Sequence, residues 1–409
     1  MNKSLASVPN FHLMRKPYYY FFAFLLYLPL QAQRYLTDVF ANVDLTSNVQ
    51  YGQAPAVSGV GIPLSLDIYT PQGDNLTNRP LMVLAHGGSF VAGNRTDTYM
   101  VAICEYFARK GYVTASISYR LGINFANIGE IDKELTRAAV RAIQDHSAAV
   151  RFFYQSAREN GNPYGIDTNR IIAGGVSAGS IAAVHSQLFW DESTASPTTQ
   201  QIVNQLGGIN GGNSGAAGFP NRAIGLFEVI GAILDTQMVN TPDVATISFH
   251  GTADDVVPYG VGFATFNGAP ILQMHGSSVL IQRLQNMGAT AEMNTFPGVD
   301  HDIFSDPVRT DTIMQRATRF FYREVVNNPS VGTLSLNQET IQLYPNPVQG
   351  DVLFLELPEP MSYRLMDVLG KEIQQGKWAA GQQRLDVSQL PKGIYLLQLP
   401  RQTHRIIRQ

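Results

Sequence analysis

Cysteine, charge and long apolar runs are all scarce in this chain of 409 residues. Its single cysteine, Cys104, excludes an intramolecular disulfide. The formal net charge of −3 gives no reason to expect nucleic acid or an anionic membrane as a partner. Charged residues make up 15% of the chain and hydrophobic residues 44%, which is typical of a globular α/β protein with a substantial core. Stability therefore has to come from a packed interior rather than from cross-links.

Signatures of bound cofactors are also lacking. The sequence has no His, Cys, Asp or Glu cluster with metal-ligand spacing, and no phosphate-binding loop or nucleotide fingerprint. We therefore expect no metal and no cofactor. Cys104 lies in the apolar run 101–107, so we expect a small buried side chain rather than a catalytic thiol. Nothing in the sequence indicates an oligomeric state.

The first 33 residues have the pattern of a targeting segment. Basic residues precede an apolar run over 18–30, and these 13 residues are too few to span a bilayer. A cleavage site follows at Leu30-Gln31-Ala32-Gln33. The pattern predicts a signal peptide over 1–33 and export of the rest, with a single membrane anchor as the alternative.

Strand-like and helix-like patterns alternate from 34 to 326, and this rhythm predicts a mostly parallel, doubly wound α/β sheet with helices on both faces. We expect an antiparallel first strand within 51–69 and a closing helix over 309–326. The other expected strands lie at 80–85, 112–119, 171–173, 223–230, 244–250 and 292–296, and the other helices at 98–110, 132–160, 181–189 and 277–287.

Two further segments break this rhythm. Residues 191–221 are polar and glycine-rich and fit neither period, which indicates an insertion near the site, either a lid or an ordinary surface excursion. After a polar linker over 327–339, short alternating runs separated by Pro and Gly fill 340–409. They predict a small all-β domain, most simply a sandwich.

A candidate nucleophile, Ser177, lies in the sequence Gly175-Val176-Ser177-Ala178-Gly179. A buried strand precedes it and a helix follows, which predicts the sharp strand-to-helix turn called a nucleophile elbow. The flanking glycines are needed because a Cβ there would collide with the neighbouring strand or helix. A glycine-rich structural turn is the alternative.

A serine nucleophile needs a base and an acid to orient that base. His301 follows the last predicted strand of the sheet, and a loop at a strand's carboxyl end can aim its imidazole at the elbow. Asp254 lies in the loop after the strand 244–250 and is our candidate acid, with Asp255 as the alternative. We expect His250 to pack or hydrogen-bond within that same loop.

An oxyanion hole needs backbone N–H groups that point at the developing charge. Gly87-Gly88-Ser89 forms a loop with few Cβ atoms in the way. We expect the donors to be the N–H groups of Gly88, Ser89 and Ala178. His86 fits a structural pin for this loop better than a second base.

Residues 49–326 resemble the α/β-hydrolase fold, and within it carboxylesterases of the hormone-sensitive-lipase and feruloyl/acetyl-esterase kind. The resemblance rests on the elbow and on four other motifs, at 66–69, 86–90, 250–254 and 300–301. It implies an α/β-hydrolase domain over 34–326 that cleaves a small-molecule or polysaccharide ester through an acyl-enzyme. Acetylated or feruloylated polysaccharide is the suggested substrate. Two residues depart from the family pattern. Relatives usually have glycine where this chain has Ser89, and many have glycine or alanine where it has Ser180.

The tail over 340–409 resembles the C-terminal sorting domain of type IX secretion in Bacteroidetes. Leu343-Tyr344-Pro345-Asn346-Pro347, the run 366–371 and the run 390–395 carry the resemblance. It implies passage through the periplasm, contact with the secretion machinery, and a final place outside the cell or on the outer-membrane surface. A carbohydrate-binding sandwich is the alternative.

Two other functions stay open at this stage. A serine exopeptidase of the prolyl-oligopeptidase type would share the fold and the triad, although no propeller domain precedes the catalytic part. A surface protein with a non-catalytic hydrolase scaffold is the other, since a fold never fixes a function.

Overall fold

The computed structural model describes residues 34–188, 194–209, 214–239, 242–328, 343–344, 346–348, 350–357, 360–367, 371–399 and 402–408. The predicted signal peptide and nearly all of the predicted linker lie outside these residues. The chain divides between Val331 and Gly332 into two compact units. Each unit is described by itself.

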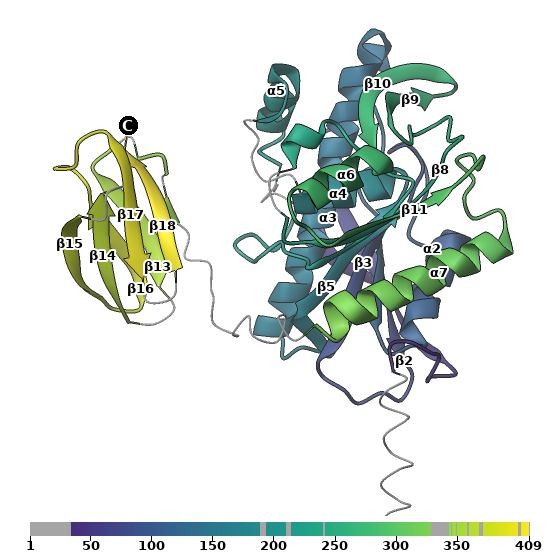
Figure 1. The fold of residues 1–409 in the computed structure, drawn as a ribbon, viewed down its shortest axis with the longest axis horizontal. Coiled ribbons are helices and arrows are strands. Elements are labelled where there is room, and N and C mark those ends of the chain that lie inside the picture. Colours follow the sequence, from purple (N-terminus) through teal and green to yellow (C-terminus); the bar gives the residue numbers. More distant parts are fainter. Residues whose placement is uncertain are drawn as a thin grey trace, which may run out of the picture. The chain divides into compact units, whose positions relative to one another are not determined.

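An eight-stranded sheet forms the centre of the first unit (Figure 1), in the order β1-β2-β4-β3-β5-β6-β8-β11. The pairs β1/β2 and β2/β4 are antiparallel, and the remaining pairs are parallel. This is the predicted, mostly parallel α/β architecture. The strands are β1 (Val43–Pro55), β2 (Gly61–Pro71), β3 (Arg79–Ala85), β4 (Val113–Ile117), β5 (Ile166–Val176), β6 (Gly225–Val229), β8 (Ala245–Gly251) and β11 (Ala291–Phe296).

Helices cover both faces of this sheet, and the side chains of a strand divide between the two cores with a period of two. On β3, Leu81 and Val83 pack in one core, and Met82 and Leu84 pack in the other. The first core is closed by α3 (Ile131–Glu159), α4 (Ala178–Leu188) and α6 (Ser277–Asn286), and the second by α2 (Thr98–Ala108) and α7 (Pro307–Phe321). Cys104 on α2 is fully buried, as predicted.

Three expectations about elements need correction. The single first strand expected within 51–69 is a hairpin of β1 and β2, because the chain reverses at 56–60, where Gly59 has a φ of 81°. The insertion contains a helix, α5 (Pro197–Gln205), which begins at a Ser196 cap followed by proline. The closing helix ends as α7 at Phe321 and continues as a π-helical turn, η4 (Tyr322–Val326).

A second small sheet was missed altogether. It consists of β7 (Ala232–Ile233), β10 (Ala269–Gly276) and β9 (Val261–Phe266), in that order. Two 3₁₀ segments, η1 (Phe125–Glu130) and η3 (Thr236–Met238), complete the unit.

A buried ion pair joins the insertion to the core of the first unit. The Arg120 guanidinium lies 2.8 Å from the Asp145 carboxylate, and both side chains are at most 5% exposed. The hydroxyl of Ser214 donates to the same carboxylate at 2.8 Å. The pair therefore fixes the end of the insertion against α3.

The second unit is a small all-β domain of two sheets, as predicted. One sheet has the order β12-β13-β16 and the other β15-β14-β17-β18, and each pairing within them is antiparallel. Alternate residues of β13, such as Leu353 and Leu355, fill the core between the sheets. The strands are β12 (Leu343–Tyr344), β13 (Val352–Leu357), β14 (Met361–Asp367), β15 (Glu372–Trp378), β16 (Gly381–Asp386), β17 (Gly393–Leu399) and β18 (Gln402–Arg408).

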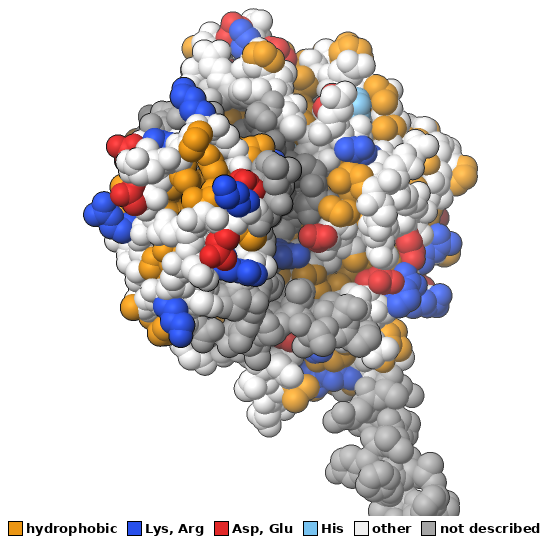
Figure 2. Space-filling view, turned by 60° about the vertical axis from the view of Figure 1, so that its left-hand side comes forward, with side chains coloured by type: hydrophobic (Ala, Val, Ile, Leu, Met, Phe, Trp, Pro, Cys, Tyr) orange, Lys and Arg blue, Asp and Glu red, His pale blue; other side chains and the backbone are white. Residues whose placement is uncertain are grey.

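The surface agrees with the low net charge. On the face shown in Figure 2, acidic and basic side chains are interspersed, and neither sign gathers into one patch. A large single-sign patch is the usual footprint of nucleic-acid binding, and this face has none.

Candidate active site

Ser177 occupies a strained turn between β5 and α4. Its φ is 53°, a left-handed value that is rare for a residue other than glycine. Its N–H donates to the carbonyl of Val229 on the neighbouring strand β6, at 2.9 Å. This is the elbow geometry expected for a nucleophile held above the end of a parallel sheet.

The two glycines of the elbow allow β3 and α4 to approach each other closely. A Cβ on Gly175 would lie 2.4 Å from the carbonyl carbon of Gly179, and one on Gly179 would lie 2.1 Å from the oxygen of Ala85. Both distances are shorter than any real contact, so the predicted collision is confirmed. The glycines are required by packing around the serine.

The structure brings Ser177, His301 and Asp254 together. Ser177 Oγ lies 3.0 Å from His301 Nε2, and His301 Nδ1 lies 2.7 Å from Asp254 Oδ2. The imidazole comes from the loop after β11 and the carboxylate from the loop after β8. Asp255, the alternative acid, is exposed. The carboxylate beside His301 is therefore that of Asp254.

Asp254 is saturated with hydrogen-bond donors. Its Oδ1 accepts the N–H groups of Val256 (2.9 Å) and Val257 (2.8 Å), and its Oδ2 faces the imidazoles of His301 and His250. Burial alone would raise the pKa of Asp254, but the hydrogen bonds from His250 and His301 hold that pKa well below its usual value. The group is therefore an ionised carboxylate, which is the form that orients an imidazole.

His250 connects Asp254 to a polar network that sequence reasoning missed. Its Nδ1 lies 2.7 Å from the hydroxyl of Ser277, and that hydroxyl lies 2.9 Å from the Glu228 carboxylate. His250, Ser277 and Glu228 are all fully buried. A signal for Glu228 was present, because it is a lone carboxylate within the apolar strand 223–230.

The loop after β3 passes directly beside the nucleophile. A Cβ on Gly87 would lie 3.3 Å from Ser177 Cβ, and the next three residues, Gly88, Ser89 and Phe90, have φ values of 113°, 53° and 63°. A run of left-handed residues turns successive N–H groups toward one side of the chain. The loop is therefore shaped to present backbone donors.

The predicted oxyanion donors are unengaged. Within the described part of the chain, no acceptor bonds the N–H groups of Gly88, Ser89 or Ala178. Ala178 is the first residue of α4, so its N–H has no acceptor within the helix and lies at the positive end of the helix dipole. These donors are available to an anion next to Ser177.

His86 and two tyrosines hold this loop in place. The His86 ring stacks on Tyr119 with 4.3 Å between centroids, and its Nδ1 lies 2.7 Å from the carbonyl of Gly87. Tyr119 donates to the carbonyl of His86, and Tyr99 accepts the N–H of Gly87, each at 2.8 Å. Burial lowers the pKa of His86. His86 is therefore a neutral structural pin, as expected, while the two tyrosines were missed.

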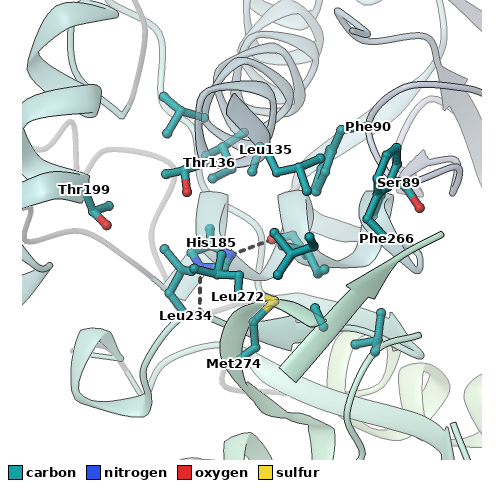
Figure 3. Close-up of a pocket in the computed structure, with 18 of the residues that line it drawn as sticks. Ser89, Phe90, Leu135, Thr136, His185, Thr199, Leu234, Phe266, Leu272 and Met274 are labelled. Carbon is teal, nitrogen blue, oxygen red and sulfur yellow. Dashed lines mark hydrogen bonds between the residues drawn. The ribbon is translucent and has the colours of Figure 1, made fainter. Parts of the chain in front are cut away.

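An apolar pocket opens at Ser177 (Figure 3). Its walls come from α3, from α4, from the insertion and from the β9–β10 hairpin. The insertion contributes Thr199 and Val203, and the hairpin contributes Phe266, Leu272 and Met274. Two segments that the sequence patterns did not assign thus form much of the cavity wall.

Neither a metal-binding cluster nor a membrane-spanning helix occurs among the described residues. Among the described ranges, no three His, Cys, Asp or Glu side chains come together as a metal site would require. None of the helices in those ranges combines the length and the hydropathy needed to cross a membrane.

Comparisons with known families give one match for each unit. Residues 66–195 match the BD-FAE family, an α/β-hydrolase-like esterase domain, and residues 342–409 match the secretion system C-terminal sorting domain. The first match includes Ser177, whereas Asp254 and His301 lie beyond it. The second match confirms the predicted sorting domain and indicates export by type IX secretion to the cell surface or beyond.

Individual relatives are more distant. A juvenile hormone esterase of Tribolium castaneum is 31% identical over 153 residues, which are 37% of this chain and 24% of that protein. The chain thus matches about a quarter of the length of that relative.

Solved structures of Thermogutta terrifontis esterase 2 are similar to the first unit. The tabun-treated enzyme is 18% identical, with a TM-score of 0.48, over 69% of this chain and 94% of that one. The propionate-bound form is 20% identical, with a TM-score of 0.47, over 68% and 93% of the two chains. The two family matches agree with the predicted resemblances to an esterase and to a secretion sorting domain.

Proposed function

We propose that this protein is a secreted serine carboxylesterase that works through an acyl-enzyme. The observation that supports the proposal most directly is the unbroken chain of contacts from Ser177 Oγ through His301 to the ionised carboxylate of Asp254. The BD-FAE match over the segment that contains Ser177 supports the same reaction class. Hydrolysis of an ester needs no further group from the protein except donors for the oxyanion.

In the first half of the reaction, Ser177 attacks the ester carbonyl. His301 Nε2 takes the hydroxyl proton, because Nδ1 is occupied by its hydrogen bond to Asp254 and keeps its own proton. The Asp254 carboxylate then stabilises the imidazolium. The same proton passes to the departing alcohol, which leaves an acyl group on Ser177 Oγ.

Backbone N–H donors stabilise the negative charge that develops on the carbonyl oxygen. The N–H groups of Gly88, Ser89 and Ala178 are the ones without another acceptor in the described residues. One such donor typically contributes about 3 kcal/mol to transition-state stabilisation. Because Ser89 contributes its N–H, its side chain does not remove the hole that glycine forms in relatives.

In the second half of the reaction, water takes the place of the alcohol. His301 removes a proton from the water as it attacks the acyl carbon, and then returns that proton to Ser177 Oγ. The acid leaves, and the site returns to its starting state. The acetylated or feruloylated polysaccharide suggested from the sequence stays a hypothesis for the substrate.

The pocket gives no support to the exopeptidase alternative. An exopeptidase has to bind a charged peptide terminus beside its nucleophile, and opposite charges supply that binding. Within the described residues, the pocket at Ser177 is lined by no Asp, Glu, Lys or Arg. Assaying aminoacyl-proline anilides beside short esters tests this directly.

The experiment that tests the esterase is Ser177→Ala, assayed on p-nitrophenyl acetate. Loss of a triad serine typically lowers kcat by about 10⁶-fold, so we expect no turnover above background. A fluorophosphonate probe should label the wild type and leave the variant unlabelled. Wild-type turnover by the variant would refute the proposal, and an unlabelled, inactive wild type would favour the non-catalytic scaffold.

A further inference from the structure

The pocket at Ser177 has room for far more than an acetyl group. Its empty volume is about 840 Å³ when the open mouth is included. The part that the centre of a water molecule can reach is about 90 Å³. On the second measure a single water needs about 10–15 Å³, so the cavity accommodates roughly six to nine methylene-sized groups. A methyl group would leave most of it empty.

The side chains around this space are mostly hydrocarbon. Ile143 and Val203 come from helices, and Phe266, Leu272 and Met274 come from the β9–β10 hairpin. In Figure 3, Ser89 and Phe90 lie on one side of the cavity and Thr199 lies on the opposite side. The apolar surface therefore extends from the oxyanion loop to the insertion.

Among the described residues that line the pocket, His185 is the ionisable side chain, and it is held neutral. Its Nδ1 lies 2.7 Å from the carbonyl of Ile181, and its Nε2 accepts the N–H of Leu234 at 3.2 Å (dashed lines in Figure 3). Burial lowers the pKa of His185 to about 4. Both ring nitrogens are thus engaged with the backbone, and the ring lines the cavity without charge.

The threonine hydroxyls in the wall are engaged within the protein. Thr136 donates to the carbonyl of Asp132 at 2.8 Å, and Thr265 donates to the carbonyl of Asp255 at 2.9 Å. The Thr199 hydroxyl lies 3.0 Å from that of Ser196. Apart from the Ser89 hydroxyl beside the nucleophile, the described wall therefore offers a sugar ring or a phenol few side-chain partners, and losing its hydrogen bonds to water would be costly.

We propose that the pocket binds an uncharged hydrocarbon arm of the ester, of about six to nine carbons on the volume estimate above, and that neither a sugar nor a feruloyl group enters it. This inference rests on the proposed esterase function and names its substrate class. The insertion and the hairpin, which supply much of the wall, set the length of the arm.

The test is a panel of esters on the full-length protein. One series varies the acyl chain of p-nitrophenyl esters from acetate to decanoate, a second varies the alkyl group of acetate esters, and methyl ferulate and acetylated xylan complete the panel. Each buried CH₂ is worth about 0.8 kcal/mol, so kcat/KM should rise about three- to fourfold per carbon up to the limit of the pocket. The rise should occur in one of the two series.

Variants of the wall sharpen the result. Ala139→Phe fills the cavity and should lower the ratio of octanoate to acetate kcat/KM by at least about tenfold, the equivalent of two methylenes. Leu272→Ser makes the wall polar and should lower the same ratio, which covers the case in which the first variant does not fold. Ala102→Phe, at an exposed position on α2, is the matched control and should keep the wild-type ratio.

The outcomes separate this inference from the function itself. A flat chain-length profile in both series, or a preference for ferulate or acetylated xylan, overturns the hydrocarbon arm while leaving the esterase intact. Failure to hydrolyse any ester, together with no fluorophosphonate labelling of Ser177, overturns the esterase.

An independent observation concerns Glu228, a fully buried carboxylate on β6. Its Oε1 accepts the N–H of Gly231 at 2.5 Å and lies 2.9 Å from the Ser277 hydroxyl, while its Oε2 is buried without a hydrogen-bond partner in the described structure. No Lys or Arg among the described residues forms an ion pair with it. A carboxylate in such a place needs a nearby proton or cation.

A continuous hydrogen-bonded network leads from Glu228 to Asp254. His250 Nε2 faces two acceptors, Asp254 Oδ2 and the carbonyl of Val257, each at 3.1 Å, so it carries a proton. At its other nitrogen, Nδ1, His250 meets the Ser277 hydroxyl, which in turn lies against Glu228.

The geometry points to Glu228 as a positioning residue for the triad. Through Ser277 it holds the His250 ring in place against Asp254. The edge of the Tyr259 ring, with its centroid 5.7 Å from that of the imidazole, limits rotation of His250. Asp254 is thereby fixed in the orientation that His301 requires.

Glu228→Gln and Ser277→Ala test this role. Each should lower kcat about tenfold, the rate effect of one lost hydrogen bond, while KM stays at its wild-type value. Each should also move the low-field proton NMR resonance of the hydrogen bond between His301 and Asp254. Ser278→Ala is the matched control, because its hydroxyl donates only to the carbonyl of Tyr259 at 2.8 Å. Wild-type kcat and an unmoved resonance in both test variants would refute the role.

Discussion

The two units of this chain bury different kinds of side chain. The first unit buries four histidines and two glutamates among its apolar residues, and the side chain of Asp254 is 0% exposed. In the described part of the second unit, the buried side chains belong to Leu, Val, Ile and Tyr alone. The first unit also holds left-handed, non-glycine residues at its site, Ser89, Phe90 and Ser177. The described part of the second unit has none.

The difference follows from what each unit has to do. Buried polar groups and strained backbone cost folding free energy, and a protein retains them where chemistry depends on them. No candidate catalytic group lies in the described part of the second unit, and an apolar core between two sheets is sufficient to fold it. Perturbing buried charge should therefore have large effects in the first unit and small effects in the second.

The largest expected effect comes from the triad acid. Asp254→Asn should lower kcat about 10⁴-fold, because an amide favours the wrong tautomer of His301. Asp255→Asn, one residue further along and exposed, is the matched control and should leave kcat unchanged. Steady-state kinetics on p-nitrophenyl butyrate measure both. Equal losses in the two variants would mean that the loop, and not one carboxylate, carries the function.

The next largest effect concerns stability. Asp145→Ala removes one partner of the buried Arg120–Asp145 pair and should destabilise the first unit by about 3–5 kcal/mol. Asp351→Ala breaks the exposed pair with Arg408 in the second unit and should cost at most about 1 kcal/mol. Urea unfolding checks both, monitored by helix circular dichroism for the first unit and by Trp378 fluorescence, in a Trp190→Phe background, for the second. Similar losses would contradict the comparison.

Acid should separate the units as well. Because folding lowers the pKa of Asp254, the unfolded chain binds that proton at a higher pH than the folded chain does. The stability that the carboxylate contributes is therefore complete above its unfolded pKa of about 4 and is lost as the pH falls below that value.

The measurement is the free energy of unfolding between pH 6 and pH 3. The curve of Asp254→Asn should be flatter than that of the wild type across this range. In the second unit, the Ser388 hydroxyl and N–H lower the pKa of Asp386, but that carboxylate is fully exposed to solvent. Asp386→Asn should therefore leave the curve of the second unit unchanged. A steep change in that curve would show that solvent does not screen the charge of Asp386.

The smallest expected effect is that of removing the tail. All the side chains of the candidate site belong to the first unit. A chain that ends before residue 342 should keep its kcat/KM on short esters and lose export from the cell, since the sorting domain is absent. A fall in kcat/KM would show that the tail contributes to the site.

Most residues of the candidate site could be predicted from sequence patterns, because its parts are local. The elbow, the loop at 86–90 and the loop at 250–254 each combine a strand end with an adjacent turn, so a short motif contains all that positions the side chain. The choice between Asp254 and Asp255 rested on chain order and motif. In the structure, Asp254 is the carboxylate that lies within hydrogen-bond distance of His301.

Two missed elements had signals that went unused. The β9–β10 hairpin reverses at Asn267-Gly268, whose φ values of 51° and 77° fit the type I′ turn that Asn-Gly favours. Helix α5 begins at Ser196-Pro197, a capping residue followed by proline at the first helical position. Both elements are short, and polar surroundings hide their periodicity.

The network behind Asp254 could not have been predicted. Glu228, His250 and Ser277 come from β6, β8 and the start of α6, and nothing in their local patterns links them. Their contact depends on the order of strands in the sheet, in which β6 and β8 are neighbours. Such long-range pairings require the assembled fold.

The sealed position of Cys104 makes this protein convenient to tag. Burial raises the pKa of its thiol to about 12, so the group stays protonated and out of reach of maleimide reagents at neutral pH. A cysteine introduced at an exposed site such as Ser58 would then be the sole reactive thiol. One dye per molecule could follow the protein on its way out of the cell, without any need to remove a native residue.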